Sequence, residues 1–248
     1  MRILVYEDSF PDRPAFDTAV SRALLRAAGD GRASAALRLH RPGDAVAFSL
    51  LDRAQPGFLG AVAAARARGF EAILRLAGGR AAVFTRETLA LAWCVPDPEP
   101  RASIGARFEE LARTVAAALR RLGVDARVGA VPGEYCPGDH SVNARGKVKL
   151  AGAGQRIVRG AAHVGGVIVL GGSARVRDVL VPVYRRMAFP WDPATVGALE
   201  DEIGAVSHES VIDSLLAELG KRHTLERARL PAERLAEAAA FEAEHRID

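Results

Sequence analysis

Residues 146–156 read Gly146-Lys147-Val148-Lys149-Leu150-Ala151-Gly152-Ala153-Gly154-Gln155-Arg156. Polar and apolar residues alternate in the first half of this stretch, which predicts a β-strand with Lys147 and Lys149 on the same side. The small residues that follow leave room beside the strand for a ligand. An ammonium group pointing into that space can neutralise the charge that develops on a carbonyl or phosphate oxygen.

Lysine is rare in this chain, since only three of its 34 basic residues are lysines and the rest are arginines. Two lysines within three positions therefore indicate a place where a guanidinium group does not serve, and we favour a functional Lys149. The alternative is a solvated edge-strand lysine that guards the sheet against aggregation.

A second glycine-rich stretch, Arg75-Leu76-Ala77-Gly78-Gly79-Arg80-Ala81-Ala82-Val83, lies between apolar segments. Glycines let a backbone loop approach a ligand closely, and the loop's N–H groups can bind an acyl carbonyl or a phosphate. Arg75 and Arg80 favour such a site over the alternative, an ordinary hairpin turn. Beyond this loop, Ala81–Phe84 and Leu89–Val95 are typical of an antiparallel strand pair.

The two cysteines differ in their surroundings. Cys94 lies in an apolar strand and is expected to be a buried small hydrophobe. Cys136 lies in the polar loop from Pro132 to His140, where Lys149 or His140 could favour a reactive thiolate. The alternative is an incidental loop cysteine.

His163 enters an apolar strand, where its position alone is more typical of a structural histidine. Together with Cys136 and His140 it lacks the paired short spacing of a zinc site, so we predict no metal. The glycine pairs Gly165-Gly166 and Gly171-Gly172 bracket one strand and are typical of ordinary strand ends.

Composition places the chain among folded proteins, because 49% of its 248 residues are hydrophobic and 26% are charged. No apolar run is long enough for a membrane helix, the N-terminus lacks a signal peptide, and two cysteines do not make a disulfide framework. We therefore expect a cytoplasmic protein with no membrane partner. The net charge is +4, but the arginines form no block, so we expect no nucleic-acid partner.

The order of helical and strand patterns predicts an α+β fold, with a mostly antiparallel mixed sheet that carries helices on its faces. The longest helical pattern is Ile104–Leu122, and Pro14–Ala28 is amphipathic with Gly29 ending it. From residue 195 onward the pattern is helical. We predict a catalytic domain over residues 1–190 and a helical C-terminal extension over 191–248 that packs on the same domain.

These segments, in this order, resemble the lipoate/biotin protein ligase catalytic family, in its lipoate ligase and cysteine-dependent octanoyltransferase branches. The resemblance covers about residues 1–190. It is carried by Pro14-Ala15-Phe16-Asp17, Leu37-Arg38-Leu39-His40-Arg41-Pro42, the stretch from Arg75 to Val83, the stretch from Lys149 to Arg156, and His163-Val164-Gly165. The fold that it implies is the catalytic domain shared by class II aminoacyl-tRNA synthetases and biotin ligases.

The resemblance also implies roles for individual residues. Lys149 would contact the acyl carbonyl, and the acyl or acyl-adenylate group would be bound by a set around it: Arg75, Ala77, Gly78, Gly79, Arg80, Ala81, Gly152, Gln155 and His163. Ligases usually have a third glycine and then His-Asp, where this chain has Arg80 and Thr85-Arg86. The Gly-Gly-Arg form and the spacing of Cys136 and Ser141 are more similar to the octanoyltransferases, although the stretch from Ser141 to Lys149 is shorter here.

We therefore expect an enzyme of protein lipoylation that transfers an octanoyl or lipoyl group to a lysine of a carrier domain through a Cys136 thioester. This reaction needs no cofactor. The donor would be an acyl-carrier protein or free lipoate, and the acceptor a lipoyl domain or a glycine cleavage H-type protein. One alternative is an ATP- and Mg²⁺-dependent lipoate ligase that forms a lipoyl-adenylate; another is a non-catalytic relative that binds acyl groups or carriers.

Overall fold

The computed structural model describes residues 1–247 and contains a main eight-stranded sheet and a small three-stranded one. The strands of the main sheet, in spatial order, are β11 (Thr224–Arg227), β1 (Arg2–Tyr6), β2 (Ala35–His40), β6 (Thr88–Pro96), β10 (Ala161–Val169), β9 (Val148–Val158), β8 (Val142–Ala144) and β7 (Ala126–Val128). The small sheet has the order β4 (Glu71–Leu74), β3 (Ala45–Phe48) and β5 (Ala82–Phe84). Strand β1 pairs in parallel with β11 and β2, whereas the other pairs of the main sheet are antiparallel.

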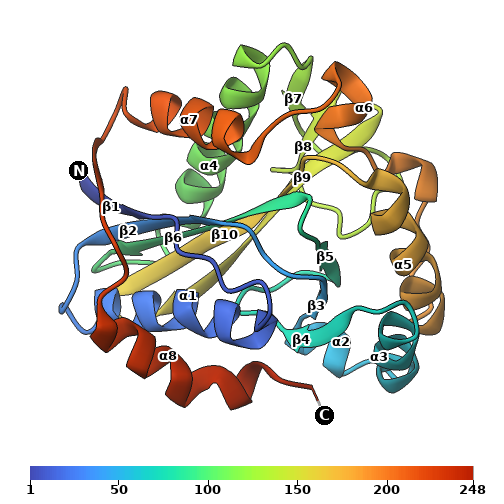
Figure 1. The fold of residues 1–248 in the computed structure, drawn as a ribbon, viewed down its shortest axis with the longest axis horizontal. Helices are drawn as coiled ribbons and strands as arrows, with labels where there is room; N and C mark the ends of the chain where they lie inside the picture. The colour runs from blue at the N-terminus through green and yellow to red at the C-terminus, as the bar shows by residue number, and fades with distance from the viewer. Residues whose placement is uncertain (248) are drawn as a thin grey trace.

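Helices cover both faces of the main sheet (Figure 1). They are α1 (Pro14–Gly29), α2 (Leu50–Arg53), α3 (Phe58–Arg66), α4 (Ile104–Arg121), α5 (Ser173–Arg186), α6 (Leu199–Ile203), α7 (His208–Leu219) and α8 (Ala232–His245), with a 3₁₀-helix at Pro193–Thr195. One face carries α4 and α7, and the other carries α1 and α8. The predicted α+β class with a mixed, mostly antiparallel sheet is confirmed.

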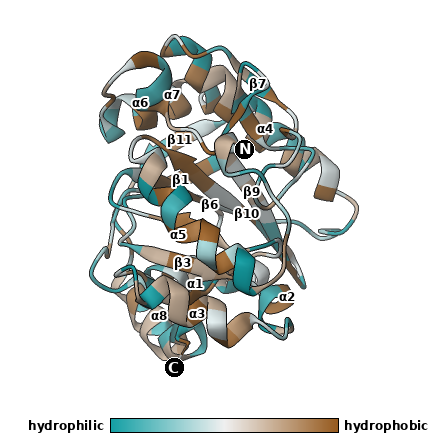
Figure 2. Cartoon of the chain, turned by 90° about the vertical axis from the view of Figure 1, so that its right-hand side faces the viewer, coloured by the Kyte–Doolittle hydropathy of each residue, from teal (hydrophilic) through white to brown (hydrophobic). Residues whose placement is uncertain are grey.

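The two faces of the sheet are chemically different because alternate residues of each strand point to opposite sides. Large apolar side chains such as Leu91 and Trp93 of β6 pack with Leu119 of α4 and Leu215 of α7 in the largest core cluster. The small sheet packs against α3 and α5 in a second cluster. Along α5, hydrophilic and hydrophobic residues alternate, as expected for a helix with one buried face (Figure 2).

One expected strand pairing is wrong. Strand β5 pairs with β3 in the small sheet and not with β6, which lies between β2 and β10 of the main sheet. The chain changes sheet at Thr85–Thr88, where the backbone N–H of Thr85 donates to the Thr88 hydroxyl and closes a tight turn. Because β6 is long and apolar, pairing on both edges buries more of it than a short hairpin would.

The C-terminal segment is not entirely helical, because β11 forms the edge of the main sheet beside β1. Helix α7 belongs to the core cluster of the main sheet and α8 packs along α1. Within residues 1–247, none of the helices combines the length and the apolarity that crossing a bilayer requires.

Candidate active site

A cavity of about 710 Å³ lies between α1, the main sheet and two loops. We call residues 75–81 the Gly loop and residues 132–141 the Cys loop. The floor of the cavity is made of small residues at paired positions of neighbouring strands: Ala90 and Ala92 on β6, Gly165 on β10, and Gly152 and Gly154 on β9. Larger side chains at these positions would fill the space, so the small residues keep the cavity open.

The glycines of β10 were expected to mark strand ends, and this prediction is wrong. Gly165 and Gly166 lie inside β10. A Cβ at Gly165 would collide with the carbonyl of Leu91 and lie 2.7 Å from the His163 ring, whereas one at Gly166 would collide with the carbonyl of Gly152. The two glycines therefore allow close packing of the sheet beside the cavity.

The Gly loop is held in place from two sides. Gly79 has a φ of +100°, which a residue with a side chain rarely adopts. Its carbonyl accepts a hydrogen bond from the Ser49 hydroxyl at 2.6 Å, and the Ala81 carbonyl accepts one from the Tyr184 hydroxyl at 3.0 Å. These contacts give the loop a defined position over the cavity.

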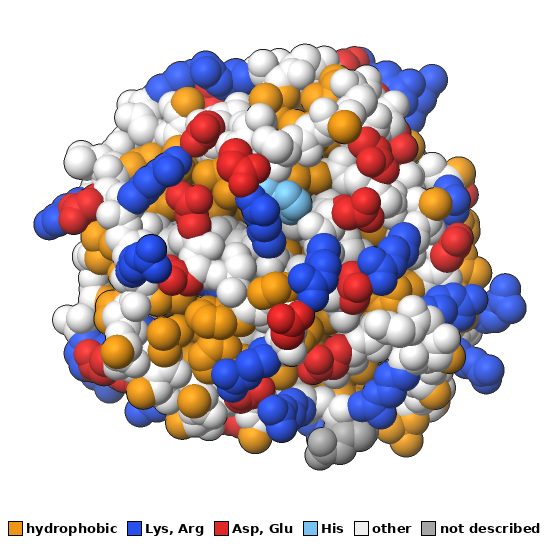
Figure 3. All heavy atoms as spheres, viewed as in Figure 1, with side chains coloured by type: hydrophobic (Ala, Val, Ile, Leu, Met, Phe, Trp, Pro, Cys, Tyr) orange, Lys and Arg blue, Asp and Glu red, His pale blue; other side chains and the backbone are white. Residues whose placement is uncertain are grey.

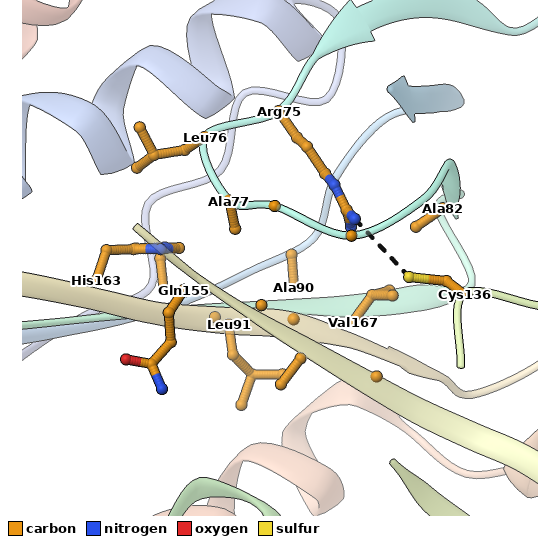
Figure 4. A pocket seen from close by; sticks show the side chains of 18 of the residues that line it. Arg75, Leu76, Ala77, Ala82, Ala90, Leu91, Cys136, Gln155, His163 and Val167 are labelled. Atoms are coloured by element: carbon orange, nitrogen blue, oxygen red, sulfur yellow. Dashed lines mark hydrogen bonds between the residues drawn. The ribbon is translucent and has the colours of Figure 1, made fainter. Parts of the chain in front are cut away.

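Cys136 lines the cavity with its sulfur against the Gly loop. The backbone N–H of Arg80 donates to its sulfur at 3.1 Å, and the Arg75 guanidinium group approaches the same sulfur at 3.8 Å (Figure 4). Hydrogen-bond donors and a cation directed at a sulfur stabilise negative charge on it. Cys136 also has a φ of +43°, a strained conformation for a non-glycine residue, and such residues concentrate at functional sites.

Lys149 reaches the cavity because of a β-bulge in β9. Between Val142 and Asn143 the partner on β9 changes from Ala151 to Lys149, so one extra residue, Leu150, is inserted. A bulge of this kind reverses which residues point to which face. In a regular strand, Lys149 and the floor glycine Gly152, which are three positions apart, would point to opposite faces of the sheet. Because of the bulge both face the cavity, and Lys149 is only 2% exposed.

Lys147, the other lysine of this stretch, is exposed and precedes β9. It does not share the environment of Lys149, so the two lysines have different roles in the structure.

The three N–H groups of the Lys149 ammonium all find partners in the Cys loop. They donate to the Glu134 carboxylate at 3.0 Å, to the Tyr135 carbonyl at 3.0 Å and to the Cys136 carbonyl at 2.7 Å. The ammonium thus fixes the backbone on which the sulfur is carried.

Glu134 was not singled out from the sequence, yet its buried carboxylate organises the Cys loop. Besides Lys149, it accepts hydrogen bonds from the Ser141 hydroxyl at 2.6 Å and from the backbone N–H groups of Val131 and Gly138. The sequence signal that pointed towards this network was the spacing of Cys136 and Ser141, because Ser141 is one of its members.

The other expected site residues divide into two groups. Arg75, Ala77, Gly78, Gly79, Gly152, Gln155 and His163 line the same cavity as Cys136 and Lys149, whereas Arg80 and Ala81 do not. The side chains of Arg80, Ala81 and Gln155 are directed elsewhere. The Arg80 guanidinium group lies 4.0 Å from the Phe189 ring centre, Ala81 is buried behind the loop, and the Gln155 amide donates to the Ile104 carbonyl of α4 at 2.7 Å. Arg80 and Gln155 still contribute backbone groups, to Cys136 and to the Gly78 N–H respectively.

A further polar group in the cavity consists of Asp17 on α1, His40 on β2 and His163 on β10. Burial, and next the nearby Arg38 guanidinium, lower the pKa of His40 to about 3, and burial lowers the pKa of His163 to about 4. Both imidazoles are therefore neutral at pH 7. Asp17 and His40 were not picked out from the sequence as site residues.

The second cysteine is structural, as expected. Cys94 is fully buried, its thiol approaches the Ser21 carbonyl at 3.7 Å, and burial raises its pKa. His140 stacks on Phe108 with the ring centres 5.3 Å apart. Over residues 1–247, no group of three or more histidine, cysteine or acidic side chains is placed to hold a metal ion.

Basic and acidic side chains alternate over the face shown in Figure 3. This face therefore has no large area of a single charge sign. Elsewhere in the described chain, basic and acidic side chains form pairs at the surface, such as Arg2 with Glu226 and Arg175 with Asp44.

The lipoyl protein ligase A/B catalytic domain model matches residues 13–220, which is most of the chain and includes Cys136, Lys149 and the Gly loop. The chain belongs to this family. Among curated proteins, the family member from Geobacillus kaustophilus named octanoyl-[GcvH]:protein N-octanoyltransferase is 28% identical over 220 residues, which is 83% of this chain and 76% of that protein. The protein of the same name from Exiguobacterium sibiricum is 29% identical over 67% of this chain and 64% of its own length.

Solved structures of the family share the fold. The crystal structure of lipoate-protein ligase A bound with ATP has a TM-score of 0.79 and 16% identity, over 98% of this chain and 95% of that one. The bipartite lipoate protein ligase of Thermoplasma acidophilum has a TM-score of 0.74 and 17% identity, over 98% and 92%. The family expected from the sequence is confirmed, and with it an enzyme of protein lipoylation.

Proposed function

We propose that this protein transfers an octanoyl or lipoyl group between proteins through a thioester on Cys136. The observation that carries the proposal is the environment of the Cys136 sulfur, which lies on the wall of a large cavity with the Arg80 N–H and the Arg75 guanidinium group directed at it. The two octanoyltransferase relatives support the same reaction class.

In the first step the Cys136 sulfur attacks the carbonyl carbon of the donor's acyl group, and the proton of its thiol passes to the donor's sulfur or nitrogen, which leaves. In the second step the amine of an acceptor lysine attacks the new thioester to form the amide, and the proton that the amine loses returns to the departing Cys136 sulfur. The acyl chain would lie along the floor of small residues beneath the Gly loop. Donors directed at the developing oxyanion contribute roughly 3–4 kcal/mol each to such reactions.

Lys149 fits this scheme as the residue that positions Cys136, because its ammonium donates to the Cys136 carbonyl. The direct contact with the acyl carbonyl that the family resemblance implies stays a prediction. It would require the carbonyl to replace one of the three present acceptors of the ammonium.

A GcvH-type protein is the partner that the name of the two octanoyltransferase relatives supports. We propose that such a protein takes part in the transfer together with a lipoyl domain, and that an acyl-carrier thioester is a donor to be tested beside it. For residues 191–248 we propose that they fold together with residues 1–190, since they share core clusters.

The residues of the cavity fit ATP-dependent activation of a free acid less well than they fit the thioester mechanism. The Lys149 ammonium donates to Glu134 and to two backbone carbonyls. The Arg80 guanidinium group lies over the Phe189 ring, and its Nη1 is 3.8 Å from the Asp52 carboxylate. Both cations are therefore already engaged by groups of the protein.

The decisive experiment is intact-mass analysis after mixing the protein with an octanoyl-carrier thioester or an octanoylated H-type protein. We expect one octanoyl adduct on the wild type and on the Cys94→Ala control, and none on Cys136→Ala. Undiminished transfer to a lipoyl domain by Cys136→Ala would remove this mechanism. Acyl-dependent exchange between ATP and pyrophosphate would instead favour the ligase reaction.

A further inference from the structure

Three polar side chains converge on the wall of the cavity without taking part in the chemistry at Cys136. Asp17, His40 and His163 come from α1, β2 and β10, and each is less than a tenth exposed. The lining of the cavity also includes apolar side chains such as Leu76, Ala77 and Ala92.

Each of these three side chains has an atom without a hydrogen-bond partner. In the part of the chain that the structure describes, Asp17 Oδ2, His40 Nδ1 and His163 Nδ1 are buried and unpaired. Asp17 Oδ1 is satisfied by the Arg38 guanidinium group and the Phe10 N–H, whereas Oδ2 lies 3.5 Å from His40 Nε2. Buried polar groups in native proteins are nearly always paired, so these atoms indicate a missing partner.

The chemistry of the three side chains defines that partner. Both imidazoles are neutral because burial lowers their pKa to about 3 and about 4, and a neutral imidazole offers one donor and one acceptor. A carboxylate only accepts. A hydroxyl group, which can donate to one of these acceptors and accept from an imidazole N–H, is complementary to this set.

The cluster lies away from the reacting sulfur. Gly152 beneath the Lys149 ammonium pairs with Val167, and His163 is four residues further along β10, roughly 13 Å away at the rise of a strand. His40 lies on β2, three strands from β9, which is roughly 14 Å at the spacing of neighbouring strands. Figure 4 shows His163 and Cys136 at opposite ends of the drawn wall, with Ala90 between them.

We propose that Asp17, His40 and His163 form a hydrogen-bonding subsite for the far end of the acyl chain, and that they select a chain ending in a hydroxyl group over a plain hydrocarbon. The proposal rests on the proposed function and goes beyond it, because neither an octanoyl nor a lipoyl chain ends in a hydroxyl group. The reason for selection is that a plain chain leaves the three polar atoms unpaired, whereas a hydroxyl group pairs with them.

The first test measures binding of octanoate and ω-hydroxyoctanoate to Cys136→Ala protein by calorimetry, which needs no turnover. We expect ω-hydroxyoctanoate to bind about tenfold more tightly, the ratio that a net hydrogen bond of ordinary strength gives. Equal affinities, or tighter binding of octanoate, would overturn the proposal and indicate that ordered water satisfies the cluster.

The second test locates the selectivity. In the Cys136→Ala background, His163→Phe and His40→Phe should each reduce the affinity ratio towards one, whereas His208→Phe should keep it. His208 lies on α7 away from the cavity wall and bonds the Thr88 carbonyl. An unchanged ratio in both cavity variants would overturn the assignment to this cluster. If either variant does not fold, the ratio of the two affinities measured on the Cys136→Ala protein still decides the proposal.

The third measurement separates the two proposals. The wild type is mixed with the pantetheine thioesters of both acids, and adduct formation is followed by intact mass. Faster adduct formation from the hydroxylated donor supports the subsite. If neither donor modifies Cys136 while the affinity ratio holds, the thioester mechanism fails and the subsite stands.

Discussion

At the scale of single residues, Gly79 occupies a position where a side chain would meet both Cys136 and Arg75. A Cβ at Gly79 would lie 3.0 Å from the Cys136 sulfur and would collide with the Arg75 guanidinium group, in a backbone conformation with a φ of +100°. The neighbouring Gly78 has open space around its own Cβ position. The two glycines of the loop are therefore not equivalent.

We predict that Gly79→Ala slows formation of the acyl-enzyme by roughly a hundredfold, because displacement of a reacting group by about 1 Å has effects of that size. Gly78→Ala is the matched control and should react nearly as fast as the wild type. Rates of adduct formation measured by quenched-flow mass spectrometry check both. Equal rates for the two variants would contradict the geometry of the loop.

Glu134 is the second residue with a testable role. It is 3% exposed and forms a buried ion pair with Lys149. Removing one partner of such a pair leaves an uncompensated buried charge.

We predict that Glu134→Gln lowers the free energy of unfolding by roughly 3 kcal/mol and slows adduct formation at Cys136. Urea denaturation and intact mass measure the two effects. The control is Glu226→Gln at the exposed pair with Arg2, which should change stability by less than about 1 kcal/mol. A stable Glu134→Gln protein of normal reactivity would show that the carboxylate is dispensable.

At the scale of elements, α8 supports the helix that forms one side of the cavity. Ala238 of α8 is fully buried in a cluster with Phe16 and Leu24 of α1, and Phe241 packs against it. The His245 ring bonds the Leu74 carbonyl at 2.7 Å, directly before the Gly loop. Loss of α8 would therefore affect both α1 and the entry to the loop.

We predict that truncation after Leu230 lowers the melting temperature by about 10 °C, because several kcal/mol of apolar contact are lost and 1 kcal/mol corresponds to about 2–4 °C in a chain of this size. Differential scanning calorimetry measures the change, and Phe241→Ala should give a smaller decrease of the same sign. An unchanged melting temperature would mean that α8 is not part of the cooperative unit.

At the scale of the whole molecule, buried histidines determine how stability depends on pH. The pKa values of His40 and His163 in the folded state, about 3 and about 4, lie below the ordinary value of 6.5. Burial also lowers the pKa of His208 and His245. Below pH 6.5 the unfolded chain therefore binds more protons than the folded one.

We predict that the free energy of unfolding decreases as the pH falls from about 6.5 towards 4, with His40 and His163 each contributing about 2 kcal/mol of loss by pH 5. Urea denaturation at pH 7.5 and pH 5 tests this. The His163→Phe variant should lose less stability than the wild type over the same interval. A wild-type denaturation midpoint that is the same at both pH values would contradict the neutral, buried state of these rings.

Much of the architecture follows from local sequence patterns. The 3.6-residue periodicity of Pro14–Gly29 and Ile104–Arg121 specifies two amphipathic helices, because one stripe of each must be buried. The apolar surroundings of Cys94 place it in the core. The glycine-rich stretches mark the cavity, since only small residues let loop and sheet approach so closely.

The tertiary structure alone decided which strands meet and which side chains share the cavity. The bulge at Leu150 turns Lys149 inward, and the partner of each strand depends on contacts far away in the sequence, as β5 and β6 show. The role of the Glu134 carboxylate became visible only when the Cys loop folded back onto β9 and met Lys149. The cluster of Asp17, His40 and His163 exists only because α1, β2 and β10, which are far apart in the sequence, meet at one cavity. Local propensity specifies the elements of this protein, whereas long-range packing determines the partners and protonation states of its polar groups.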